Sequence, residues 1–275
     1  MASGIENGGI VERLILGLVL SALAGGIAFR LGMLDGSGWL GAMLVGTAIF
    51  GFGGWPWAVL LIAFFVSASA LTRYGSGRKA EAAQDFAKGG RRDLGQALAN
   101  GGVGAALAIL WGFSPHPVFW WMFVGSLAAV TADTWATEVG LLSGRPPRDL
   151  WRGRRVPPGT SGAITLEGTI AGGLGALGIG ILAVGLSPVG GSPGMTLPVG
   201  LAGFLGMLLD SLLGATVQRI YWCDRCGKET ERPIHRCGQP TRPFRGWKWL
   251  NNDGVNALAA LAGALSMGLW SIARG

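Results

Sequence analysis

Three long stretches of this sequence, residues 36–72, 94–132 and 168–209, contain no Asp, Glu, Lys or Arg. A helix needs about 20 apolar residues to cross the hydrocarbon core of a bilayer, so each stretch can hold two crossings joined by a tight turn. Only 13% of the residues are charged, whereas about a quarter is usual in soluble domains. The sequence therefore predicts an all-α, polytopic integral membrane protein with a single transmembrane domain over residues 1–275.

Turn-forming residues divide the apolar stretches into about eight transmembrane helices. Proline and glycine near residues 53–56, 114–117 and 187–194 separate span two from three, four from five, and six from seven. Acidic residues precede the first apolar run, which is atypical of a cleaved signal peptide, so we expect a retained helix there. The predicted spans are residues 13–32, 38–54, 56–72, 94–113, 118–140, 163–186, 196–219 and 250–272.

Positive charge is confined to a few connections. Nineteen of the 22 Lys and Arg residues lie in residues 73–92, 145–155 and 219–248. With eight spans, these segments follow spans three, five and seven, so they share one side of the membrane and both termini lie on the other. The positive-inside rule assigns that side to the cytoplasm. The net charge of +7 therefore indicates a protein of the cytoplasmic membrane, in contact with the lipid bilayer, rather than one that binds nucleic acid.

A short similarity between the two halves suggests an internal repeat. Residues 100–105 (Asn-Gly-Gly-Val-Gly-Ala) resemble residues 252–257 (Asn-Asp-Gly-Val-Asn-Ala). Both copies start from the same side, so spans 2–4 and 6–8 would form a parallel repeat. Chance similarity between glycine- and alanine-rich helices is the alternative.

Polar side chains within the spans are candidates for a functional site, because ionisable groups are costly in lipid. The span directions place most of them toward the cytoplasmic face. A stabilising hydrogen-bond network is the alternative, but so many carboxylates favour a site. Carboxylate and amide oxygens are the ligands that Mg²⁺ prefers. The residues are the carboxylates Asp133, Glu138, Glu167, Asp210 and Asp253 and the amides Gln96, Asn100, Gln218, Asn252 and Asn256.

Residues 156–162 (Val-Pro-Pro-Gly-Thr-Ser-Gly) lead into the sixth span. Small residues at the start of a helix expose free N–H groups, and the helix dipole favours an anion there. Five arginines lie within residues 145–155 nearby. The segment is therefore predicted to be a phosphate-binding loop that uses Gly159, Thr160, Ser161 and Gly162.

The last connection carries a separate signature. Cys223, Cys226, His235 and Cys237 lie within fifteen residues. Four soft ligands that begin with a Cys-x-x-Cys pair are typical of a closed, tetrahedral Zn²⁺ site. A disulfide would leave one cysteine unpaired and is unusual on the cytoplasmic side. We expect residues 221–248 to form a cytoplasmic zinc-binding loop inserted between the last two helices, with the metal in a structural role.

Four ordered motifs, residues 132–140, 158–162, 210–218 and 252–256, resemble the transmembrane protein 19 family over nearly the whole chain. That family includes phytyl-phosphate kinases, which convert a prenyl monophosphate to the diphosphate with a nucleoside triphosphate. The resemblance implies the same class of activity here. The Cys/His loop occurs in only some members, which implies that the loop is not part of the chemistry.

The resemblance and the chemistry of the residues together suggest roles. The partners would be CTP or ATP and an isoprenoid monophosphate, with Mg²⁺ at the site. The expected catalytic and Mg²⁺-binding residues are Asp133, Glu138, Asp210 and Asp253. The expected substrate-binding residues are Lys79 (or Lys88), Gln96, Asn100, Thr134, Gly159, Thr160, Ser161, Gly162, Ser211, Gln218, Asn252 and Asn256.

Other functions fit parts of the same pattern. A prenyl-alcohol kinase or a CTP-dependent lipid cytidylyltransferase would also use a nucleotide and a lipid. A transporter would also combine a repeat with buried carboxylates, but it would place its polar site near mid-membrane. The bias of the polar residues toward one face favours the enzymes.

Overall fold

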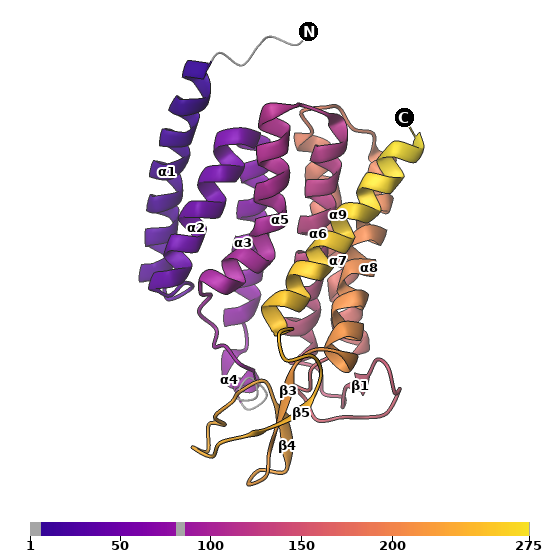
Figure 1. Cartoon of the computed structure of the whole chain (residues 1–275). Coiled ribbons are helices and arrows are strands. Elements are labelled where there is room, and N and C mark those ends of the chain that lie inside the picture. The colour runs from indigo at the N-terminus through magenta and orange to yellow at the C-terminus, as the bar shows by residue number, and fades with distance from the viewer. Residues whose placement is uncertain (1–6, 81–85, 275) are drawn as a thin grey trace.

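The computed structural model describes residues 7–80 and 86–274 of the chain. Long helices run side by side as one bundle (Figure 1). The connections are short at one end of the bundle, whereas residues 74–93, 141–165 and 217–251 form longer connections at the other, where most of the polar structure lies. The long helices are α1 (Asn7–Arg30), α2 (Gly36–Ala48, continued by a π-helical turn at Ile49–Gly53), α3 (Trp55–Arg73), α5 (Leu94–Phe113), α6 (Pro117–Gly140), α7 (Leu166–Leu186), α8 (Thr196–Thr216) and α9 (Asn252–Arg274).

Seven of these helical segments are long and apolar enough to cross a membrane by length and composition. The exception is α6, whose 24 residues span about 36 Å at 1.5 Å per residue. It lies in the middle of the bundle and contacts α3, α5, α7, α8 and α9. Residues 123–132 of α6 are all buried, so this helix faces protein rather than lipid. The predicted helical integral membrane protein is confirmed, with seven candidate spans among the described residues where the sequence predicts about eight.

Turn residues set the helix ends where the sequence predicts them. Gly54 has a φ of +79° at the end of the π-helical turn, a conformation that glycine adopts without strain. Pro56 and Pro117 lie in the first turns of α3 and α6, where a missing backbone N–H costs nothing. His116 caps α6, because its Nδ1 accepts a hydrogen bond from the Val118 N–H at 3.3 Å.

Glycine allows the central helices to approach closely. A Cβ atom at Gly125 of α6 would lie 2.3 Å from the carbonyl oxygen of Gly263 on α9. The reverse substitution would bring a Cβ at Gly263 to 2.4 Å from the Gly125 carbonyl oxygen. Such backbone contact is typical of membrane helices, which associate through packing rather than through the hydrophobic effect.

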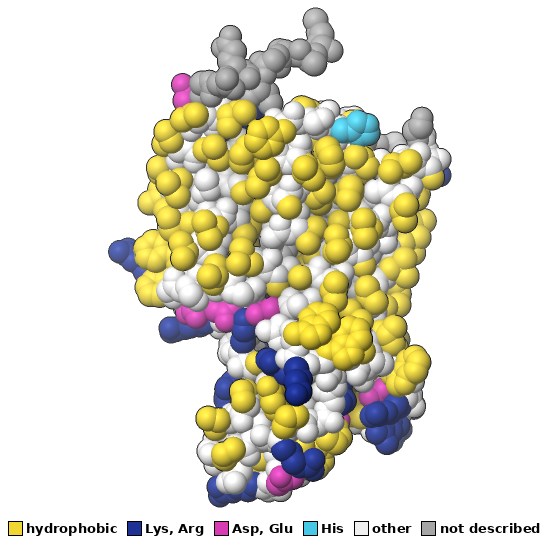
Figure 2. Space-filling model, viewed as in Figure 1, with side chains coloured by type: hydrophobic (Ala, Val, Ile, Leu, Met, Phe, Trp, Pro, Cys, Tyr) yellow, Lys and Arg dark blue, Asp and Glu magenta, His cyan; other side chains and the backbone are white. Residues whose placement is uncertain are grey.

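All three basic segments lie at one end of the bundle, while α1 begins and α9 ends at the other (Figure 1). On the face shown in Figure 2, apolar side chains cover the helices and the charged side chains gather mostly at and below the lower edge. The short helix α4 (Ser76–Lys79) and two small antiparallel sheets belong to this end. The first sheet pairs β1 (Arg148–Asp149) with β2 (Ala163–Ile164).

The second sheet lies between α8 and α9, where the sequence predicts an inserted loop. Strand β3 (Ile220–Cys223) is central and pairs antiparallel with β4 (Lys228–Thr230) on one side and β5 (Arg242–Arg245) on the other. The sequence did not predict these strands, although they do not change the helical class. The parallel internal repeat and the cytoplasmic location of this end stay predictions.

Candidate functional site

A cavity of about 460 Å³ opens among the helix ends on the side of the bundle that carries the sheets. Its walls come from α3, α5, α6, α7, α8 and α9 and from the connections between them. Gln218 is instead buried behind the wall, 1% exposed. The predicted residues that line the cavity are Lys79, Lys88, Gln96, Asn100, Asp133, Thr134, Glu138, Gly159, Thr160, Ser161, Gly162, Asp210, Ser211, Asn252, Asp253 and Asn256.

Three carboxylates from three different helices line the cavity. Asp133 on α6 and Asp210 on α8 lie against each other within hydrogen-bonding reach, and Asp253 lies in the first turn of α9. Among the described residues, Asp210 Oδ2 and Asp253 Oδ1 are buried without a hydrogen-bond partner. Unpaired buried carboxylate oxygens are unfavourable. These orphaned oxygens fit the hard, oxygen-binding cation that the sequence predicts.

Lys88 brings a positive charge to the same place. Its Nζ donates to Asp93 Oδ1 at 2.7 Å and also to Asp253 Oδ2. Burial lowers the pKa of Lys88, but the hydrogen bonds to Asp253 and Asp93 raise it, and the resulting pKa lies above its usual value. Asp93 also forms a capping box with Gln96 at the start of α5. Lys88 therefore stays protonated, and Gln96 supports the helix start as well as lining the cavity.

Lys79 and Glu138 form an ion pair in the wall of the cavity. Lys79 Nζ donates to Glu138 Oε2 at 2.7 Å, and Thr72 Oγ1 donates to Glu138 Oε1 at 2.6 Å. The Lys79 side chain also donates to the Leu71 carbonyl oxygen at 2.6 Å and is almost fully buried. The sequence predicts Lys79 as a phosphate ligand and Glu138 as a metal ligand, whereas in this structure they neutralise each other.

The predicted phosphate-binding loop forms a turn whose φ angles at Gly159 and Gly162 are +85° and +78°. Its place differs from the predicted helix start. Strand β2 separates the turn from α7, and Thr165 caps that helix by accepting from the Gly168 N–H at 3.1 Å. The prediction that the turn lies at the helix N-terminus is therefore wrong, because pairing of β2 with β1 keeps the chain extended before α7 begins. The turn still faces the cavity.

Several cavity residues were not predicted from the sequence. Arg92 donates to Ser69 Oγ at 2.7 Å and lies over the Phe65 ring, and burial lowers its pKa. Glu231 follows β4 and reaches the cavity from the Cys/His loop. Burial raises the pKa of the Glu231 carboxyl. No local pattern distinguishes these residues from the other charged residues in the basic connections.

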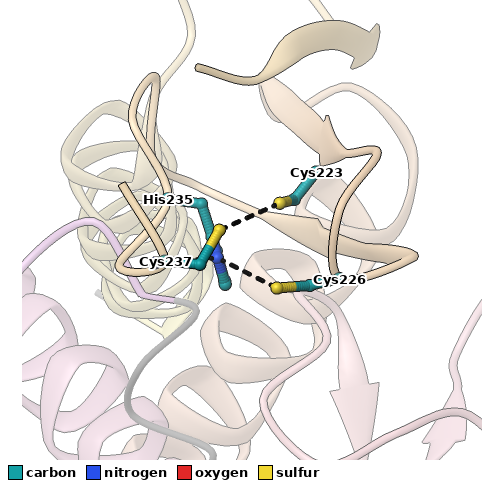
Figure 3. Close-up of side chains that lie close together, drawn as sticks. All are labelled: Cys223, Cys226, His235 and Cys237. Carbon is teal, nitrogen blue, oxygen red and sulfur yellow. Dashed lines mark hydrogen bonds between the residues drawn. The ribbon is translucent and has the colours of Figure 1, made fainter. Parts of the chain in front are cut away.

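The four predicted zinc ligands converge at the end of the sheet (Figure 3). Cys223 Sγ and Cys237 Sγ are 3.7 Å apart, and Cys226 Sγ lies 3.5 Å from His235 Nδ1. All four ligand atoms lie within 4.8 Å of one another. A tetrahedral zinc ion with normal bond lengths gives S···S of about 3.8 Å and S···N of about 3.6 Å. The hydrogen bond with His235 lowers the pKa of Cys237 to about 6, so this donor set fits a divalent metal.

The fold and the cavity define the class of the protein: a polytopic membrane protein with a carboxylate-lined cavity at one end of its helix bundle. The family described as integral membrane protein DUF92 matches residues 19–264. The chain belongs to that family, and the predicted resemblance to the transmembrane protein 19 family is confirmed.

Three relatives show the breadth of the similarity. Protein PGR of Arabidopsis thaliana is 31% identical over 276 residues, which cover 90% of this chain and 93% of the relative. The uncharacterized membrane protein MJ0933 of Methanocaldococcus jannaschii is 34% identical and covers 68% of this chain and 75% of its own length. Protein VTE6, chloroplastic, of Arabidopsis thaliana is 27% identical and covers 84% and 63%, respectively. No solved structure matches the chain.

Proposed function

We propose that this protein is a membrane-embedded isoprenoid-phosphate kinase, which transfers a phosphoryl group from a nucleoside triphosphate to a prenyl monophosphate. The observation that carries the proposal is the cavity itself, which Asp133, Asp210 and Asp253 line together with the glycine-containing turn of residues 159–162. Lys88 lines it too and donates to Asp253. The similarity to the transmembrane protein 19 family, which includes phytyl-phosphate kinases, supports the same class of reaction.

In the proposed reaction, an oxygen of the prenyl monophosphate attacks the γ-phosphorus of the nucleotide. The bond from that phosphorus to the β,γ-bridging oxygen breaks, and the nucleoside diphosphate leaves. The second pKa of a phosphate monoester is near 6, so the attacking group is already largely ionised at neutral pH and needs no strong general base. The chain therefore has to position the phosphates and stabilise their charge.

The proposed roles of the cavity residues are of two kinds, metal binding and phosphate binding. Magnesium, when bound, would neutralise the charge of the phosphate oxygens, and Asp133, Asp210 and Asp253 would hold it. Both oxygens of Glu138 already accept hydrogen bonds, so Glu138 would join this set only by releasing Lys79 and Thr72. The amides of Asn100, Asn252 and Asn256 would orient oxygens, while residues 159–162 and Lys88 would receive phosphates.

The proposal is tested with purified protein in detergent or lipid discs, supplied with Mg²⁺ and radiolabelled CTP or ATP. We expect transfer of label to phytyl or geranylgeranyl phosphate, with little transfer to the corresponding alcohols. Transfer to the alcohols alone would identify a prenyl-alcohol kinase, and incorporation of the whole nucleotide monophosphate would identify a cytidylyltransferase. Absence of transfer to every prenyl phosphate would overturn the proposal.

A structural zinc ion at Cys223, Cys226, His235 and Cys237 is a second part of the proposal. All four ligands come from protein, so the ion would have no open position for catalysis. We expect about one zinc per chain by elemental analysis of the purified protein. The Cys226→Ser variant should lose most of this zinc, whereas Ser192→Ala, in the connection at the opposite end of the bundle, should retain it. Intact protein without zinc would contradict the assignment.

A further inference from the structure

The sheet between α8 and α9 is joined to the cavity wall through a partly buried arginine on β5. Arg245 Nη1 donates to the Gly214 carbonyl oxygen of α8 at 2.7 Å. Its Nη2 donates to the Ser161 carbonyl oxygen at 3.4 Å and to Glu229 Oε2 on β4 at 3.0 Å. One side chain therefore connects two strands of the sheet with α8 and with the glycine-containing turn.

A second connection runs through Glu231 and has four hydrogen-bonded members. Glu231 Oε2 accepts from the Ala87 N–H at 2.9 Å, and Glu231 Oε1 accepts from Gln218 Nε2 at 2.8 Å. Gln218 Oε1 in turn accepts from Ser161 Oγ at 2.8 Å. Ala87 is next to Lys88, which holds Asp253. The chain of hydrogen bonds therefore links the Lys88 segment to the glycine-containing turn, and Glu231 is its central member.

The Cys/His cluster restrains the segment that carries Glu231 at both ends. Cys223 and Cys226 precede Glu231 in the sequence, and His235 and Cys237 follow it. Most side chains of residues 224–240 are polar or charged, so this loop has little apolar surface with which to build a core of its own. A loop of this kind depends on its metal for a defined conformation.

We infer that the sheet with the Cys/His cluster positions residues of the cavity. Glu231 is the positioning residue: it holds the glycine-containing turn and the Lys88 segment in place for phosphate binding. The resemblance implies that the Cys/His loop takes no part in the chemistry. Here it acts on the chemistry indirectly, through Glu231, Gln218 and Ser161. The kinetic consequence rests on the proposed kinase activity, whereas the structural coupling rests only on the proposed zinc site and the hydrogen bonds above.

The coupling is tested by hydrogen–deuterium exchange of the intact, zinc-loaded protein. The Glu231→Ala variant should exchange about 5- to 10-fold faster in residues 86–90, which corresponds to losing the hydrogen bond of about 1–1.5 kcal/mol from the Ala87 N–H. Residues 159–165 should also exchange faster, because Gln218, which holds Ser161, loses its bond to Glu231. Zinc-stripped wild-type protein should show the same increase. The control is Asp224→Asn, whose exposed side chain pairs with exposed Arg242, and it should leave both segments unchanged.

A second variant keeps the test decisive if Glu231→Ala folds poorly. Glu231→Gln preserves the volume but can accept from only one of the two donors, so it should show an intermediate increase and retain its zinc. Unchanged exchange in both segments for Glu231→Gln or for the zinc-stripped protein would overturn the inference, as would equal increases over the whole chain.

Kinetics then separate the inference from the proposed function. If the protein transfers phosphoryl groups, Glu231→Ala should lower kcat about 10- to 100-fold, as loss of a supporting hydrogen bond typically does, and Glu231→Gln should recover part of it. Faster local exchange in a protein without kinase activity would sustain the coupling and refute the kinase. A protein with kinase activity whose kcat and local exchange are unaffected by Glu231→Ala would support the kinase and refute the coupling.

Discussion

Replacing Asp210 with asparagine is expected to reduce kcat for phosphorylation of a prenyl phosphate about 10²- to 10³-fold, the usual effect of removing one electrostatic group from a transition state. Asparagine has the same shape but no negative charge. One oxygen of Asp210 is buried without a partner among the described residues, and the side chain lies against Asp133. The change therefore removes a proposed Mg²⁺ ligand without altering the packing of α8.

The measurement is a Mg²⁺ titration of the initial rate, with thermal stability measured in parallel. The curve should shift to higher Mg²⁺ concentration, and the melting temperature should not fall. Glu12→Gln is the matched control, because Glu12 is an exposed carboxylate on α1 and does not line the cavity; it should keep wild-type kinetics. Wild-type rates and Mg²⁺ dependence in Asp210→Asn would remove Asp210 from the metal site.

Replacing Gly162 with alanine is expected to be strongly destabilising. Gly162 has a φ of +78°, and a Cβ there would lie 2.1 Å from the Ala215 nitrogen and 2.5 Å from the Ser211 carbonyl oxygen of α8. The unfavourable backbone conformation costs about 1–2 kcal/mol, and the forced displacement of α8 adds about 1–3 kcal/mol. Because the same movement separates the turn from Ser211 and Asp210, activity should fall together with stability.

Gly153→Ala separates the two contributions. Gly153 has a φ of +68°, but a Cβ atom added there would lie in open space, with no neighbouring atom within 4 Å. The Gly153→Ala variant should therefore lose only the stability that the unfavourable backbone conformation costs. Thermal unfolding in detergent should show a clearly larger loss for Gly162→Ala than for Gly153→Ala. Equal losses would mean that the turn does not pack against α8 as the structure shows.

Much of the architecture is determined by the sequence alone. The charge-free stretches predict the spans, because charged groups are costly in hydrocarbon. Proline and glycine predict the connections, since they restrict the local backbone. The number of spans then places the basic segments at one end. The lengths of α5, α7 and α9 agree with the predicted spans to within a few residues, and nearly all of the predicted site residues line one cavity.

Only the tertiary structure decides which of these polar groups pair with each other and which can bind a metal or a phosphate. Lys79 and Glu138 are 59 positions apart and neutralise each other, while Lys88 reaches Asp253 across 165 positions. Glu231 enters the site by accepting from Ala87, 144 positions away. Local sequence patterns record which groups are costly to bury and where the chain turns. They do not record which groups form hydrogen bonds or ion pairs with each other, because those partners are set by the packing of helices and strands that are far apart in the chain.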